Sequence, residues 1–190
     1  MWCDGWLHRA QRCESPNYGP RPDGAVIDLV LIHSISLPPG IYGGDAIERL
    51  FTNQLDWDAH PYYAQIRGMQ VSAHFLVRRD GKLFQFVSCD ARAWHAGSSV
   101  WQGRANCNDF SIGIELEGLE GEQFEAVQYD VLAAVIAELG ECYPIAAVAG
   151  HEHVAPGRKI DPGPGFDWSR LIALTAATAP HFPEVVRPVS

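Results

Sequence analysis

The sequence predicts an α/β protein, a single domain with a mixed central β-sheet flanked by helices. Short aliphatic and β-branched segments alternate along the chain with segments of helical periodicity, an alternation typical of the α/β class. The length of 190 residues corresponds to one domain at about 150 residues per domain. The 18 glycines and 13 prolines gather between the periodic segments, which indicates long ordered loops around one core.

The chain is predicted to have three parts. Residues 1–24 are rich in proline and contain no periodic segment, so they are expected to form an extended N-terminal arm. Residues 25–180 contain the periodic segments and form the predicted domain. Residues 181–190 are expected to form a C-terminal tail.

The first half of the predicted domain contains a buried strand, a short helix and a hairpin. Residues 25–33 are almost all aliphatic, as expected for a strand covered on both faces, and the strand ends before a pair of prolines that forces a loop. Residues 46–51 predict a short helix. Residues 71–77 and 83–87 predict a β-hairpin, since an Asp-Gly turn lies between two apolar runs.

The second half adds two strands and two helices. In the strand predicted over 110–117, apolar residues alternate with Gly113, Glu115 and Glu117, so the two sets face opposite sides. Apolar residues recur at helical spacing over 122–139. The remaining elements are a short apolar strand and, after a loop rich in proline and glycine, a last helix, predicted over 146–149 and 168–178.

Composition and charge argue against several classes of function. A formal net charge of −9 without a Lys/Arg-rich run is unsuited to nucleic acid or an anionic membrane surface. No apolar stretch approaches the ~20 residues of a membrane span. Five cysteines without a C-x-x-C pair argue against a disulfide framework and a zinc ribbon. The N-terminus lacks a signal-peptide pattern, so a cytoplasmic monomer is expected.

Two histidines stand where an α/β sheet usually collects ligands. His33 closes one predicted strand and His151 directly follows another, and loops at strand ends commonly carry a site. Two neutral imidazoles and the carboxylate of Asp161 suit zinc with an open fourth position. The residue types alone leave a second interpretation equally open, in which these are hydrogen-bonded polar residues and Asp161 caps a turn. They also leave open whether His151 or His153 binds.

Glu115 is the third group with possible chemistry. It lies in a segment too apolar for a surface charge, so this carboxylate needs a partner or a chemical role. A buried salt bridge to Arg104 or Lys159 is at least as well supported by the residue types alone.

Six motifs follow one another in a fixed order between about Gly5 and Trp168. They are His33–Gly40, Val71–Phe75, Arg79–Gly81, Arg92–Gly97, Cys107–Gly118 and Gly150–Pro164. Together they resemble the zinc N-acetylmuramoyl-L-alanine amidase family, which also includes the peptidoglycan recognition proteins. Several blocks in one order are far more specific than any single motif.

The resemblance implies one Zn²⁺ per chain, bound by His33, His151 and Asp161. It selects His151 as the second histidine ligand, because in the family this residue directly follows a glycine and precedes the aspartate by ten residues. His153 stands where relatives commonly carry aspartate and is interpreted as a departure beside the site.

The resemblance also implies a reaction. The bond cut is the amide between (1,6-anhydro-)N-acetylmuramic acid and L-Ala of the stem peptide, in muropeptides from bacterial peptidoglycan recycling. Glu115 is expected to act as general base, and Lys159 to offset the negative charge that develops on the carbonyl oxygen.

Five residues are assigned to substrate binding on weaker grounds. Trp94 and His95 are expected to line the cleft, and Arg158 to pair with carboxylates of the peptide. Asn106 and Ser34 replace a basic residue and an asparagine that the family usually carries, so they are expected to alter substrate contacts.

Two alternative functions remain in view. One is a non-catalytic module that recognises peptidoglycan fragments, although such modules typically lack the full zinc set that the resemblance implies here. The other is a periplasmic amidase that acts on polymeric peptidoglycan, which the missing signal sequence disfavours.

Overall fold

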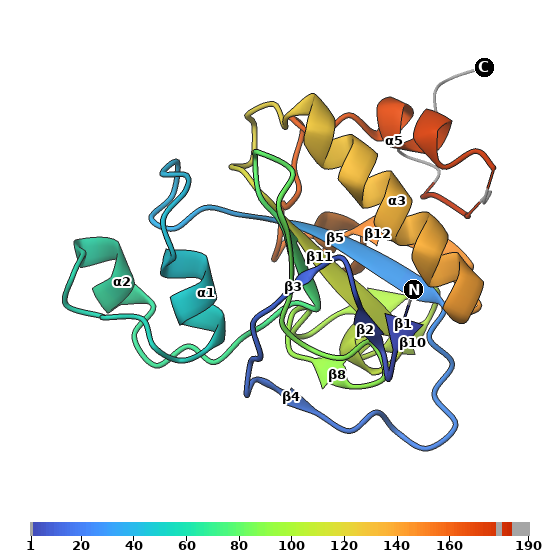
Figure 1. The fold of residues 1–190 in the computed structure, drawn as a ribbon, viewed down its shortest axis with the longest axis horizontal. Coiled ribbons are helices and arrows are strands. Elements are labelled where there is room, and N and C mark those ends of the chain that lie inside the picture. Colours follow the sequence, from blue (N-terminus) through green and yellow to red (C-terminus); the bar gives the residue numbers. More distant parts are fainter. Residues whose placement is uncertain (1, 178–179, 184–190) are drawn as a thin grey trace.

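A mixed six-stranded sheet forms the centre of the molecule (Figure 1), which a computed structural model describes over residues 2–177 and 180–183. Across the sheet the strand order is β12, β5, β11, β6, β7, β3. The predicted α/β class with a mixed central sheet is confirmed. The strand bounds are β3 (Gln11–Arg12), β5 (Leu29–Ile35), β6 (Phe75–Val77), β7 (Leu83–Gln85), β11 (Ser111–Glu117) and β12 (Ala147–Gly150).

The middle of the sheet is parallel. Strand β5 pairs in parallel with both β11 and β12, and β11 pairs in parallel with β6. Strands β6 and β7 form the predicted antiparallel hairpin, and β3 joins the edge beside β7. The carboxyl ends of β12, β5 and β11 therefore meet at one edge of the sheet, where α/β proteins usually bind ligands.

Helices cover one face of the sheet. Figure 1 shows α3 (Ala126–Cys142) lying along this face with α5 (Trp168–Leu174) beside it. Their apolar side chains pack against one set of alternating residues from the parallel strands, a core that includes Val30, Ile32, Ile112, Ile114, Leu116, Leu132, Val135 and Leu139. Burial of this apolar area is the main favourable contribution to folding, at roughly 25 cal/mol per Å².

Short elements and loops cover the opposite face. Helix α1 (Ala46–Phe51) packs with Leu76 and with the phenylalanines of the β7 region. A second group of apolar residues, from the loops around β9 (Val100–Trp101) and the 3-10 turn Cys107–Asp109, packs against Leu29 and Leu31 of β5. The remaining short elements are α2 (Pro61–Gln65), α4 (His151–Val154), β8 (Arg92–Ala93) and β10 (Arg104–Ala105).

The bounds of three elements, β5, α3 and α5, differ from the predicted ones. Strand β5 runs from Leu29 to Ile35 instead of over 25–33, so His33 lies inside the strand, two residues before its end. Helix α3 begins at residue 126 because Glu125 and Gln128 form a capping box, with the Glu125 N–H donating to Gln128 Oε1. Helix α5 ends at Leu174, and the predicted end at 178 lies outside the described residues.

The described part of the N-terminal segment, residues 2–24, packs onto the domain through short strands. Strands β1 (Trp2–Cys3) and β2 (Trp6–Leu7) pair with each other, β3 joins the central sheet, and β4 (Tyr18–Gly19) pairs with β8. Arg21 then donates hydrogen bonds to four backbone carbonyls of the domain. Of the predicted tail 181–190, the described residues include only the first three positions, and the rest lies outside them.

The described part of the chain contains no helix that is both long enough and apolar enough to cross a membrane. The five cysteine thiols are all free, and two of them, Cys89 and Cys107, are buried.

Candidate metal centre and active site

Three predicted site residues stand in one row across the parallel strands. His33 on β5 and Glu115 on β11 are register partners. Gly150 pairs with Ile32, one position earlier, so His151 begins the chain segment that leaves β12 beside His33. Because side chains alternate between the faces of a strand, the imidazole of His33 and the carboxylate of Glu115 project from the same face.

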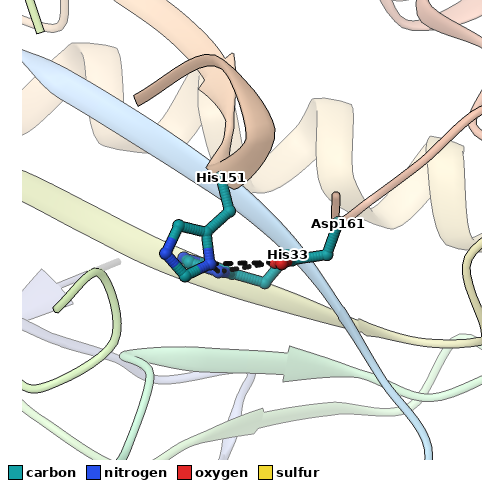
Figure 2. A group of neighbouring side chains, drawn as sticks. All are labelled: His33, His151 and Asp161. Carbon is teal, nitrogen blue, oxygen red and sulfur yellow. Dashed lines mark hydrogen bonds and ion pairs between the residues drawn. The ribbon is translucent and has the colours of Figure 1, made fainter. Parts of the chain in front are cut away.

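His33, His151 and Asp161 converge on a single point, as Figure 2 shows. The Nδ1 atoms of the two histidines lie 3.0 Å apart, and Asp161 Oδ2 lies 3.1 Å from His33 Nδ1 and 3.0 Å from His151 Nδ1. All three residues are buried. Tetrahedral zinc with ligand bonds of about 2.0 Å places its ligand atoms about 3.3 Å apart. The donor set and its spacing therefore fit this metal.

The protonation of the cluster also suits a cation. Burial, with the charge of His151 as a further cause, lowers the pKa of His33 to about 4, so its imidazole is neutral at pH 7. Burial opposes ionisation of Asp161, but its polar contacts with the rings of His151 and His33 outweigh burial and hold the pKa of that carboxyl below its usual range. One carboxylate and neutral imidazoles are the forms that bind zinc.

Glu115 lacks the salt bridge that the residue types left open. Arg104 pairs with Asp28 at 3.0 Å instead. Within the described residues, Glu115 Oε2 is a buried oxygen with no hydrogen-bond partner. Burial raises the pKa of Glu115 well above its usual value, the charge of Asp161 raises it further, and Lys159 opposes the shift. A carboxylate in this environment is a stronger base than one in water.

A cleft of about 260 Å³ opens over these groups. His33, Glu115, His151 and Asp161 line it together with Lys159, which is exposed on the loop after α4. In the described part of the chain Lys159 makes no ion pair within 4 Å, so its ammonium is available to a ligand. The five predicted metal and catalytic residues thus share one cavity.

The weaker assignments divide into two groups. Ser34, Trp94 and His95 line the cleft, and the buried Ser34 hydroxyl has no hydrogen-bond partner among the described residues. Asn106 and Arg158 are not among the cleft-lining residues. A substrate role for any of the five stays a prediction.

Arg158 and Asn106 already have structural contacts. Arg158 donates from Nη2 to the carbonyls of Ala96 and Ser98, at 2.6 Å each, which ties its loop to the segment after His95. Asn106 has a positive φ of 58° and precedes the 3-10 turn, a conformation that asparagine tolerates well.

His153 is separate from the cluster. Its Nδ1 accepts a hydrogen bond of 2.9 Å from the Gly150 N–H, and its ring packs edge-on against Trp168. The same loop thus directs one histidine into the cleft and uses the other to hold the turn.

Sequence reasoning missed one wall of the cleft. This apolar wall comes from the region between β5 and β6 and includes Leu37, Pro39, Tyr62, Ile66 and Met69. Apolar residues scattered in a loop-rich segment show no periodicity in the sequence. Only the folded structure shows that they line the cleft together.

The fold and the site define a family. The chain matches the N-acetylmuramoyl-L-alanine amidase family over residues 22–164 and belongs to it. Among curated relatives it is similar to the 1,6-anhydro-N-acetylmuramyl-L-alanine amidase AmpD of Salmonella typhimurium (strain SL1344). The two are 52% identical over 177 residues, covering 92% of this chain and 95% of that protein.

Solved structures agree with this relationship. A crystal structure of a selenomethionine derivative of AmpD is 53% identical and has a TM-score of 0.89, covering 92% of this chain and 98% of that chain. The amidase AmiD from E. coli, in complex with the substrate anhydro-N-acetylmuramic acid-L-Ala-D-γ-Glu-L-Lys, is 30% identical with a TM-score of 0.58. That match covers 81% of this chain and 60% of AmiD.

Proposed function

We propose that this chain is a zinc-dependent amidase that cleaves the amide between 1,6-anhydro-N-acetylmuramic acid and L-Ala of a muropeptide, in cytoplasmic peptidoglycan recycling. The observation that carries the proposal is the buried cluster of His33, His151 and Asp161, which shares its cleft with Glu115, whose buried Oε2 has no hydrogen-bond partner among the described residues. The substrate is supported by the name of the AmpD relative and by the ligand that the AmiD relative holds.

The three ligand residues would hold one Zn²⁺ through His33 Nδ1, His151 Nδ1 and Asp161 Oδ2, the atoms that converge. When bound, zinc supplies Lewis-acid polarisation of the scissile carbonyl and lowers the pKa of water at its open position.

Glu115 takes the role of general base. Its carboxylate accepts a proton from the attacking water as the new C–O bond forms. It then returns the proton to the amide nitrogen as the C–N bond breaks, so that L-Ala leaves as a neutral amine. The raised pKa of Glu115 suits this transfer, because it makes the carboxylate a stronger base toward the proton of the attacking water.

Lys159 stabilises the developing charge. Its exposed ammonium lines the cleft without an ion-pair partner among the described residues. A cation beside the carbonyl oxygen lowers the barrier when negative charge develops there, by about 3–4 kcal/mol in comparable oxyanion sites.

The first experiment is zinc content together with hydrolysis of an anhydro-muropeptide, measured on one sample before and after chelation. We expect one zinc per chain, and activity that chelation removes and added zinc restores. Zinc-free protein that binds the muropeptide without cleaving it would instead support a recognition module. Faster hydrolysis of intact sacculi than of soluble anhydro-muropeptide would support the periplasmic alternative.

A further inference from the structure

A chain of polar groups leads away from the metal-binding cluster on its inner side. His33 Nε2 lies 3.0 Å from His95 Nδ1, and His95 Nε2 lies 3.4 Å from Ser111 Oγ. The Ser111 hydroxyl in turn donates a hydrogen bond of 2.6 Å to the Cys107 carbonyl. The three side chains connect the edge of the cluster to the backbone oxygen of Cys107.

The Cys107 carbonyl oxygen sets the direction of each hydrogen bond in this series of polar groups. A serine hydroxyl has one hydrogen, and Ser111 uses it on Cys107. Ser111 Oγ must therefore accept from His95 Nε2–H, which leaves His95 Nδ1 without a hydrogen. His95 Nδ1 then accepts from His33 Nε2–H. The remaining nitrogen of His33 is the bare Nδ1, which faces His151 and Asp161.

The imidazole of His95 occupies a space that the sheet leaves for it. A Cβ atom on Gly113 of β11 would lie 2.5 Å from His95 Cγ and from His95 Nδ1, far inside contact distance. The backbone on either side is also held, because Asn108 Oδ1 accepts from the N–H groups of His95 and Ala96, at 3.2 and 2.8 Å. The ring of His95 packs edge-on against that of His33. These contacts fix the position of the His95 ring beside His33.

His151 is held differently. Its Nε2 lies 2.9 Å from the Ala96 carbonyl and 3.3 Å from Arg158 Nη2, which itself donates to that carbonyl at 2.6 Å. Because a backbone carbonyl can only accept, this contact favours the tautomer of His151 that carries its hydrogen on Nε2. His95 has two tautomers of its own, so it selects the tautomer of His33 only while Ser111 holds it.

We propose that His95 is a positioning residue, which Ser111 orients so that it holds His33 in the tautomer and ring position that bind the metal through Nδ1. The inference rests on the proposed zinc-dependent function. It also changes the role of His95: the residue lines the cleft, but its Nδ1 faces the ligand His33 and not the substrate.

Two substitutions at this position separate hydrogen bonding from packing. His95→Asn places Oδ1 near the position of Nδ1 and keeps an acceptor for His33 Nε2–H, whereas His95→Phe keeps a planar ring and removes the acceptor. His8→Phe, an exposed histidine near the N-terminus, is the matched control. Zinc affinity of each purified protein is measured by competition with a chromophoric chelator, with thermal unfolding in excess chelator as the test of folding.

We expect His95→Phe to bind zinc about 10–100-fold more weakly than the unmodified protein. His95→Asn should recover most of that loss, and His8→Phe should show none. Unchanged affinity in His95→Phe, or an equal loss in both His95 variants, would overturn the proposal. Failure of the unmodified protein to bind zinc would contradict the proposed function instead, so the two failures are distinct.

A second measurement does not depend on any variant folding. In the zinc-loaded, ¹⁵N-histidine-labelled protein, long-range ¹H–¹⁵N correlations report which nitrogen of each ring carries hydrogen. We expect His33 to carry it on Nε2, and His95 to carry it on Nε2 with a bare Nδ1. A hydrogen on His95 Nδ1 would overturn the assignment.

Discussion

Glu115 and His33 are register partners on the parallel strands β11 and β5, so the backbone ladder itself sets the spacing of the proposed base and the proposed metal ligand. Side chains alternate with a period of two along a strand, so a slip of one residue would turn Glu115 away from the cleft and the isoleucines toward it. The apolar core on the helix face opposes that slip. The same burial that stabilises the sheet therefore also aligns the site.

Substitution of Glu115 should separate catalysis from metal binding. In Glu115→Gln the shape of the side chain is kept but the base is lost, so we expect kcat to fall by about 10²–10⁴-fold. Zinc content should stay at the level of the unmodified protein, because Glu115 lies outside the cluster of metal ligands. Elemental analysis and muropeptide hydrolysis on the same preparation test both statements; near-normal hydrolysis would refute the assignment of the base.

Asp161→Ala should have the opposite signature. This carboxylate is the one anionic side chain in the cluster, and without it only the two imidazoles remain as ligands. We expect zinc to be lost during purification and activity to be lost with it. Glu152→Ala is a suitable control, since Glu152 is a neighbouring carboxylate outside the cluster. Equal zinc contents in the two variants would show that Asp161 is not a ligand.

Lys159→Met should lower turnover while leaving the fold and the metal intact. The side chain is exposed, and among the described residues it makes no ion pair whose loss would destabilise the protein. We expect kcat to fall by about 10²–10³-fold, the loss typical of one missing oxyanion-stabilising group, with a smaller change in KM. A change confined to KM would mean that Lys159 binds the substrate equally in the ground and transition states.

His74 should make stability depend on pH. It is fully buried, its Nδ1 accepts from the Gly113 N–H, and burial, aided by the charge of Arg21, lowers its pKa from 6.5 to about 3. Between these values the unfolded chain binds a proton that the folded chain does not. The free energy of unfolding therefore falls with decreasing pH below about 6.5, by up to about 1.4 kcal/mol per pH unit from this residue.

His74→Asn keeps an acceptor for the Gly113 N–H and cannot titrate. Urea unfolding in excess chelator, from pH 8 to pH 4.5, should show a shallower loss of stability in this variant than in the unmodified protein. Above about pH 6.5 the two curves should run parallel. Parallel curves over the whole range would show that His74 is not the source of the dependence.

Much of the fold follows from local pattern. The short helix over 46–51 matches α1, the hairpin around Asp80 and Gly81 is present, and the alternation of residues 110–117 correctly places Glu115 on the face opposite the isoleucines. These features depend on backbone preferences and on periodicity over a few residues. The observed start of helix α3 differs from the predicted start, because the capping residue Glu125 fixes where this helix begins.

The sequence by itself determined the class of fold, the strand that carries His33 and the strand that His151 follows, and the family to which the motifs belong. Only the tertiary structure decided that Glu115 makes no salt bridge within the described residues, that Arg158 holds a loop outside the cleft, and that His95 contacts His33 above Gly113. The physical reason is range. Periodicity reflects neighbours in the chain, whereas the partner of a loop side chain depends on which distant segment the packed sheet brings within hydrogen-bond distance.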